Sequence, residues 1–370
     1  MPPAPYLHSL FLWEPLHEGP GTRAGVVVKR TYDLVSGEPL RPSEAPYPLF
    51  EGDVYFGKPG QTALQHERDG VPLKPLTDVV VNARAWARRG TTTREATAAV
   101  QIGTQRKEVL VLGDRYVQQR PNMDPFFSEP RPFESIWVRW EYAYGGTDPK
   151  GPEGQPMPYP RNPLGMGIAF RNPALTVDGM ALPNIEDPRD RLTPERYVID
   201  PMRWEEAVKP TGLGWVPRTF WDRRNLSGLP ESMRALWDRL YNRRRDGSTV
   251  ERKPFPAFNL QFWNGAAPGL AVPRLAGNEL IHLERLDPDG DFDVVLPGVA
   301  PTVAIEKEGE AGAGESIDVE MPLTTVAIQK EERLVYLVWG GVPRIDREPT
   351  GSPPPDFDKL RVRLGERRVR

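Results

Sequence analysis

Proline constrains what this chain can fold into more than any other feature of its sequence. The 370 residues include 43 prolines and 34 glycines. Proline lacks a backbone N–H and does not fit inside a helix or a central strand, so long parts of the chain are expected to be loops. The 10 tryptophans, 11 tyrosines and 13 phenylalanines are spread along the sequence, which indicates loops packed on a core rather than disorder.

The rest of the composition argues against several functional classes. Because there is no cysteine, disulfides, thiolate zinc sites, iron–sulfur clusters and cysteine nucleophiles are excluded. The formal net charge of −3 does not favour nucleic acid as a partner. No apolar run approaches the ~18 residues of a membrane span, and the short apolar N-terminal stretch has no basic residue before it, unlike a signal peptide. We therefore expect a cytoplasmic protein without a membrane partner.

Strand patterns predominate in the sequence, and only one helix is predicted. Residues 229–245 place apolar side chains at helical spacing after a proline in the first turn. The sequence DPDG at 287–290 predicts a tight turn, because proline fixes φ and glycine tolerates a positive φ. Strands are predicted over residues 24–34, 77–88, 96–102, 108–112, 135–144, 278–286, 291–298, 302–308, 323–329 and 334–339.

These patterns predict a mainly β fold, in which a large antiparallel, sandwich-like architecture carries long, packed Pro/Gly-rich loops and one amphipathic helix. The domain is expected over residues 1–342, and any internal boundary is expected near 225–255. Residues 343–370 are predicted to be a Pro-rich linker, with GSPPP at 351–355, followed by a basic tail. The tail is either a solvated, disordered end or a docking segment for an acidic partner.

No motif predicts a catalytic, cofactor or metal site. The glycines within 164–167 and 212–214 do not lie between a strand and a helix, so neither segment fits a dinucleotide-binding loop. His66 and Glu67 are metal-ligand types, but no second histidine lies at ligand spacing, which favours a polar turn. His282 lies within a predicted strand, where a packed or exposed residue is more common than a catalytic base.

Two groups of residues leave alternatives open. The carboxylates Asp53, Glu141 and Asp148 lie near aromatic loops and could include a glycosidase pair, which requires a separation that a sequence cannot show. The aromatic segments 135–144 and 215–221 could form a platform for stacking sugars or peptides, although core packing is the favoured interpretation. A binding protein needs aromatic or arginine anchors rather than a reactive group. The candidate partner-binding residues are Tyr144, Gly145, Gly146, Trp215, Arg218, Phe220 and Trp221.

The order of short motifs along the chain resembles one bacterial family, the domain-of-unknown-function family 2169. Three motifs carry much of the similarity: KPLTD at 74–78, YAYGG at 142–146 and NPLGMG at 162–167. The resemblance extends from about residue 24 to 339. Its other segments are VVVKRTYDL, EGDVYFG, the HERDG that precedes KPLTD, LVLGDR, PFESIWVRWE, LPNIEDP, GLGWVPRTFWDRR, FNLQFWNGAAP and LPG.

This resemblance implies a role in type VI secretion. Members of the family are encoded beside secreted toxins and act as their adaptors, or chaperones. Such an adaptor binds its cognate effector, here expected through the effector's N-terminal segment, in the cytoplasm of the producing cell. It then helps to load the effector onto the spike, which consists of the valine–glycine repeat protein VgrG and its PAAR tip. The resemblance implies no catalytic residue and no enzymatic activity.

Two other functions fit the same sequence. A β-sandwich carbohydrate-active enzyme or sugar-binding protein would use a carboxylate pair or an aromatic platform. A structural spike or baseplate subunit would assemble symmetrically with copies of itself rather than with one toxin. Ligand-dependent stabilisation by sugars would favour the first alternative, and co-purification with sheath components would favour the second.

Overall fold

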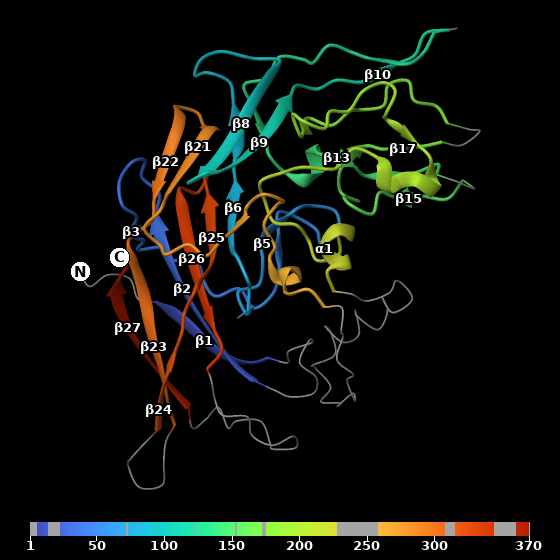
Figure 1. Cartoon of the computed structure of the whole chain (residues 1–370). Helices are drawn as coiled ribbons and strands as arrows, with labels where there is room; N and C mark the ends of the chain where they lie inside the picture. The colour runs from blue at the N-terminus through green and yellow to red at the C-terminus, as the bar shows by residue number, and fades with distance from the viewer. Residues whose placement is uncertain are drawn as a thin grey trace, which may run out of the picture.

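A computed structural model describes residues 6–13, 23–71, 73–121, 123–151, 154–171, 175–227, 258–307, 315–343 and 360–369. The fold is mainly β, as predicted, with three larger sheets and a region of packed loops (Figure 1). Within these residues, no helix is both long and apolar enough to cross a lipid bilayer. The predicted helix at 229–245 and the linker at 351–355 lie outside the described residues.

The largest sheet has seven strands in the order β1-β2-β26-β25-β6-β20, with β3 paired to the end of β2. It is antiparallel except for β25 and β6, which run parallel. Every residue of β6 and β25 is buried, which fits the apolar residues at their centres (VVV and VAI) and the central positions of the strands in the sheet. The strands are β1 (Leu7–Trp13), β2 (Arg23–Asp33), β3 (Arg41–Pro42), β6 (Thr77–Asn82), β20 (Ala271–Val272), β25 (Leu323–Gln329) and β26 (Leu334–Gly341).

A five-stranded sheet, in the order β18-β9-β8-β21-β22, contains two hairpins, one of them at the predicted tight turn. One hairpin turns at Gly103, and the other turns at 287–290, where Gly290 has a φ of 117°. This positive φ is the conformation that the DPDG sequence predicts. The strands are β8 (Glu95–Ile102), β9 (Gln105–Leu112), β18 (Ile185–Glu186), β21 (Leu280–Asp287) and β22 (Gly290–Val295).

The third sheet corrects the prediction for the C-terminal tail. Its order is β24-β23-β27, and β27 contains most of the predicted basic tail. The strands are β23 (Val299–Lys307), β24 (Glu315–Val319) and β27 (Leu360–Arg368). Leu360, Val362 and Leu364 pack against the main core, and this alternating apolar pattern explains why the tail forms a strand despite its arginines.

The loop region contains short paired strands and 3₁₀ turns. The predicted strand 135–144 is wrong as one element, because Asn162 Nδ2 donates to the carbonyls of Trp140 and Tyr144 and holds the chain in a turn. The predicted strand 77–88 is likewise two strands, β6 and β7, which are separated by Ala83.

The remaining elements are short. They are β4 (Val54–Tyr55), β5 (Leu64–His66), β7 (Arg84–Trp86), β10 (Val117–Gln118), β11 (Phe126–Phe127), β12 (Ser135–Trp137), η1 (Trp140–Tyr142), β13 (Tyr144–Gly145), β14 (Thr147–Asp148), β15 (Met157–Pro158), β16 (Met166–Gly167), β17 (Ala169–Phe170), β19 (Val198–Ile199), η3 (Pro201–Glu206), α1 (Trp221–Asn225) and η6 (Leu260–Trp263).

The loops have a hydrophobic core of their own. The main cluster of buried apolar residues lies among the three sheets, and a second cluster is built from the loop region between residues 117 and 208. Tyr144, Tyr159 and Phe170 are among its fully buried side chains. This second core confirms that the Pro/Gly-rich loops are packed, as the distribution of aromatic residues predicts.

The inward face of β27 provides a test of its place in the fold. We expect Leu364→Asp to lower the free energy of unfolding by about 1–2 kcal/mol, because it puts a charge where a half-buried leucine packs on the core. Arg367→Asp, on the exposed face of the same strand, should change it by less than about 0.5 kcal/mol. Urea unfolding measures both, and equal effects would contradict a packed β27.

Candidate functional site

The structure divides the predicted partner-binding residues between the core and the surface. Trp215, Phe220 and Tyr144 are only 1%, 2% and 1% exposed, so these three side chains present almost no surface to a partner. Trp215 is held in place by its carbonyl, which accepts a hydrogen bond from Trp140 Nε1, and Phe220 packs edge-on against Trp140. These aromatic residues stabilise the fold, as the core-packing interpretation predicts.

Arg218 and Trp221 remain partly accessible, but each already has intramolecular contacts. The side chain of Arg218 is 13% exposed and forms ion pairs with Glu67 and Asp53. Trp221 stacks edge-on against Trp204, with ring centroids 5.0 Å apart, and the Arg224 guanidinium lies over its ring. The seven predicted residues therefore do not form one exposed patch.

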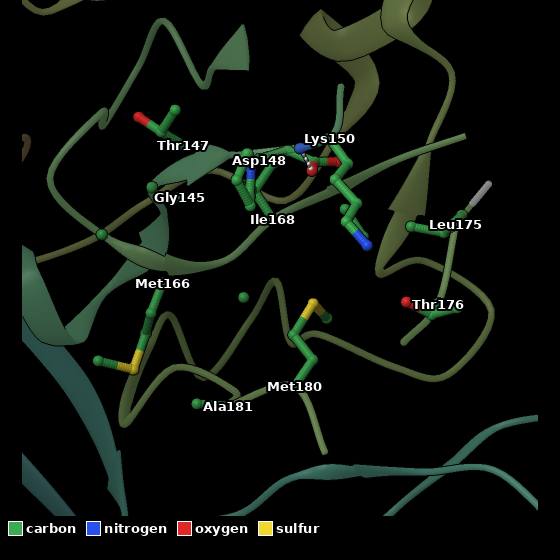
Figure 2. A pocket seen from close by; sticks show the side chains of 15 residues that line it. Gly145, Thr147, Asp148, Lys150, Met166, Ile168, Leu175, Thr176, Met180 and Ala181 are labelled. Atoms are coloured by element: carbon green, nitrogen blue, oxygen red, sulfur yellow. Dashed lines mark hydrogen bonds between the residues drawn. The ribbon is translucent and has the colours of Figure 1, made fainter. Parts of the chain in front are cut away.

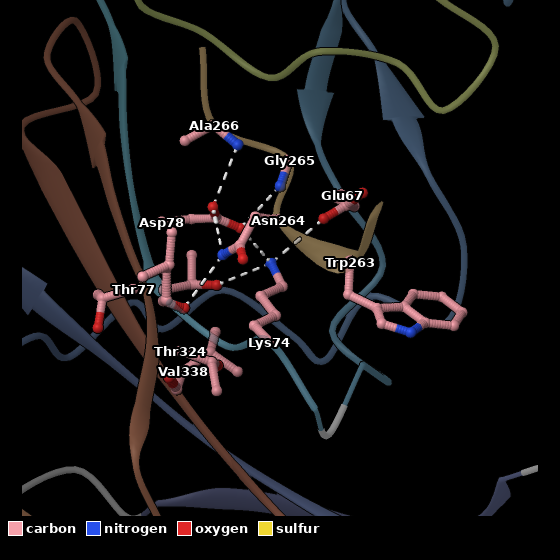
Figure 3. A network of polar contacts seen from close by, with 12 residues as sticks. Glu67, Lys74, Thr77, Asp78, Trp263, Asn264, Gly265, Ala266, Thr324 and Val338 are labelled. Carbon is pink, nitrogen blue, oxygen red and sulfur yellow. Dashed lines mark hydrogen bonds and ion pairs between the residues drawn. The ribbon is translucent and has the colours of Figure 1, made fainter. Parts of the chain in front are cut away.

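A buried cluster of charged groups occupies the position where several family motifs meet (Figure 3). Lys74 Nζ lies 2.7 Å from Asp78 Oδ2 and 3.2 Å from Glu67 Oε2. Arg223 Nη2 and Arg218 Nη2 both contact Glu67 Oε1, at 2.7 and 3.0 Å. This ion cluster joins β6 and the segment after β5 to helix α1 and the loop before it.

Asp78 connects the ion cluster to the backbone of a distant loop. Its carboxylate accepts hydrogen bonds from the backbone N–H groups of Gly265 and Ala266 and from Asn264 Nδ2, at 2.9, 3.2 and 2.9 Å. Both carboxylate oxygens are thus occupied by protein donors. The ion cluster and these hydrogen bonds thus hold together segments that lie far apart in the sequence.

Electrostatics keep Glu67 ionised despite its burial. Burial alone raises the pKa of this carboxyl, but the positive charges of Arg223, Arg218 and Lys74 outweigh it and lower the pKa to about 2. Three cations around one carboxylate explain the sign of this shift. Glu67 therefore remains charged at neutral pH and cannot act there as a general acid.

His66 is the last residue of β5 and is buried there, rather than lying in the predicted polar turn. Its ring stacks on Phe50 with centroids 4.3 Å apart, and Nδ1 lies 3.2 Å from the Tyr336 hydroxyl. Burial, followed by the nearby charge of Lys29, lowers the pKa of His66 to about 3. Within the described ranges, no cluster of three or more His, Cys, Asp or Glu residues could hold a metal ion.

Gly145 and Gly146 line an open pocket, the pocket between β13 and β16 (Figure 2). Its volume is about 440 Å³. A Cβ at Gly145 would lie 2.2 Å from the Asn162 carbonyl oxygen, and one at Gly146 would lie 2.4 Å from that of Gly165. The two glycine motifs therefore allow their backbones to approach, and β13 and β16 pair in parallel beside the opening.

Apolar side chains and backbone make up most of the wall of this pocket. The Lys150 side chain extends toward the same space (Figure 2). Asp148 is the one carboxylate among the lining residues that the structure describes, and its two oxygens accept hydrogen bonds from the backbone N–H groups of Lys150 and Phe170, both at 2.9 Å. The apolar lining residues are Met166, Ile168, Ala169, Leu175, Met180 and Ala181.

The other carboxylates considered for a glycosidase pair are also bound to backbone amides. Asp53 Oδ1 accepts a hydrogen bond from the backbone N–H of Arg68, at 3.0 Å. Glu141 Oε1 accepts one from the backbone N–H of Ala63, at 2.8 Å. Each carboxylate thus fixes a separate loop segment, and these contacts do not favour a catalytic pair.

A family described as an uncharacterized protein conserved in bacteria (DUF2169) matches residues 21–340. The chain belongs to this family. No curated protein and no solved structure matches it. In this DUF2169 chain, the KPLTD motif supplies Lys74 and Asp78 to the ion cluster, whereas YAYGG and NPLGMG build the pocket.

Removal of the charge on Glu67 tests the structural role of the ion cluster. We expect Glu67→Gln to lower the free energy of unfolding at neutral pH by about 3–5 kcal/mol, because it removes the carboxylate paired with buried Arg223 and leaves Lys74 with Asp78 alone. Glu38→Gln removes an exposed ion pair with Arg41, in which the Glu38 side chain is 52% exposed, and should change stability by less than about 1 kcal/mol. Urea unfolding compares the two, and equal effects would contradict this role.

The lowered pKa of His66 predicts a loss of stability in acid. Between pH 6 and 4 the unfolded chain binds a proton at this residue and the folded chain does not, so the free energy of unfolding falls as pH falls. The contribution is roughly 1.4 kcal/mol per pH unit. We expect His66→Gln to remove this slope and His8→Gln, at an exposed position, to keep it. Chemical unfolding at several pH values measures the difference, and identical slopes would show that His66 is not buried in its neutral form.

Proposed function

We propose that this protein is a non-catalytic adaptor, or chaperone, of type VI secretion. It binds a toxic effector in the cytoplasm of the producing bacterium and helps to load it onto the VgrG/PAAR spike. Membership of the DUF2169 family supports this proposal through the family role that the motifs imply. The proposal concerns protein–protein binding and requires no cofactor.

The character of the pocket between β13 and β16 is the observation that carries the proposal. A pocket of 300–1,000 Å³ with an apolar lining is typical of a binding site, and this one has about 440 Å³. Among the described lining residues the one carboxylate, Asp148, is committed to backbone hydrogen bonds. The lining thus supports binding of an apolar group rather than chemistry on it.

The occupant that fits best is an apolar side chain on an extended segment of the effector. Met166 and Met180 are unbranched and polarizable, and such side chains adapt to the shape of a partner. We assign this segment to the N-terminal part of the effector, as the family role suggests.

A charge placed in the pocket tests this proposal directly. We expect Met180→Glu to reduce capture of the effector from the producing cell by at least about tenfold, because a carboxylate in an apolar pocket opposes burial of an apolar group. Met202→Glu is the matched control, since Met202 is 89% exposed and does not line the pocket. Quantitative affinity capture with mass spectrometry measures both variants.

Three results would count against the proposal. Equal capture by Met180→Glu and the unchanged protein would show that the pocket does not hold the effector. Recovery of sheath or baseplate proteins in place of one toxin would favour a structural subunit. Stabilisation by a sugar, lost in Met180→Glu, would favour a carbohydrate-binding protein. Melting temperatures of both variants confirm that each is folded.

A further inference from the structure

Two sheets end at the same side of the molecule, each with an edge strand. In the described part of the chain, β1 pairs only with β2, and β27 pairs only with β23. Glu366 of β27 accepts hydrogen bonds from the Tyr6 hydroxyl and from Arg30 Nη1, at 2.8 and 2.6 Å. These contacts place β27 over the β1–β2 edge of the large sheet, so the two edges lie one above the other.

The hydrogen-bond register shows which backbone groups of β27 face outward. The backbone N–H of Val369 donates to the Gly298 carbonyl at 2.9 Å, and the antiparallel register continues from there without a bulge. Because such bonds alternate along an antiparallel pair, Arg361, Arg363, Gly365 and Arg367 bond to β23. The residues between them are Val362, Leu364, Glu366 and Arg368. Their backbone N–H and C=O groups point away from β23, to the open side of this edge strand.

The side chains of β27 alternate between an apolar face and a positively charged face. Leu360, Val362 and Leu364 turn inward against the main core. The outward positions carry arginine except at Gly365, and Arg361, Arg363 and Arg367 are exposed. The one acidic residue of the strand, Glu366, is already paired with Arg30. The exposed pair of Arg363 with Glu306 is open to solvent and neutralises little of this charge.

We propose that the edge of β27 binds an extended acidic segment of a partner protein by strand addition. The outward N–H and C=O groups supply the main-chain hydrogen bonds of such a complex. Acidic side chains at alternate positions of the segment lie beside the arginines, and apolar side chains between them lie on the inner side, next to Val362 and Leu364. Opposite charges on neighbouring strands stabilise the pairing, whereas like charges destabilise it.

The same charge argues against other occupants. A second copy of the chain would place arginine beside arginine across the new strand pair, and positively charged edges are a known protection against such self-pairing. An anionic polymer or lipid surface would attract the arginines but would leave the outward backbone groups without partners. The edge is also separate from the pocket between β13 and β16, because β27 and β13 lie at opposite sides of the molecule (Figure 1).

The experiment measures binding of a short peptide of alternating valine and glutamate to the full-length protein. Val362→Pro removes an outward N–H group without touching the bonds to β23, so it should weaken binding by about tenfold or more. Val362→Ala keeps that N–H group and should weaken binding by less than about threefold. Arg367→Glu should weaken binding by about threefold to tenfold, whereas Arg189→Glu, exposed in a loop elsewhere, should not.

Hydrogen exchange supplies a readout that needs no variant. In the free protein, the amides of Val362 and Leu364 should exchange faster than those of Arg363 and Gly365, which bond to β23. The glutamate peptide should slow exchange at the first pair and leave the second pair unchanged. This measurement remains decisive if Val362→Pro fails to fold.

Several outcomes would overturn the proposal. Equal binding of a valine–lysine peptide would remove the role of charge. Binding of the glutamate peptide without protection of Val362 and Leu364 would remove strand addition. Self-association that is lost in Val362→Pro would assign the edge to a second copy, and binding of anionic vesicles but not of the peptide would assign it to lipid. None of these readouts depends on the pocket or on the secretion role.

Discussion

The buried carboxylate of Glu67 and the three cations around it hold together segments that secondary structure does not connect. Lys74 lies in the loop before β6, whereas Arg218 lies in the loop before α1 and Arg223 lies within α1. A chain with 43 prolines has fewer backbone N–H donors with which to join such segments. Here charged side chains join the segments instead. Asp78 joins a further segment, because its carboxylate accepts hydrogen bonds from the backbone N–H groups of Gly265 and Ala266.

Much of the β framework could be predicted from the sequence, because its signals are local. Alternation and β-branched residues located the long strands, and DPDG located a turn that has the expected positive φ. Pairings between distant segments have no local signal, and the parallel contact of β6 with β25 is an example. The strand β27 was missed because its arginines dominate the composition, although Leu360, Val362 and Leu364 alternate between them.

The candidate site, like the fold, could be predicted from the sequence only in part. Aromatic residues suggested binding anchors, but Trp215 and Phe220 are buried, because large apolar side chains stabilise a core in the same way that they stabilise an interface. Gly145 and Gly146 do line a pocket, and the glycine motifs were its signal. Met166 and Met180 could not be identified in advance, since only the folded chain brings 175–181 beside β16. Most of the DUF2169 motifs thus encode the scaffold, while the proposed interactions lie at its surface.

The proposed adaptor role is tested most directly by the proteins that the producing bacterium secretes. Quantitative mass spectrometry would compare the secreted proteins of a strain lacking this gene with those of the parent and of a complemented strain. The account predicts that one toxin-like protein is lost while the VgrG spike and the other effectors are secreted as before. Loss of all type VI secretion would instead indicate a structural subunit, and an unchanged set of secreted proteins would contradict the adaptor role.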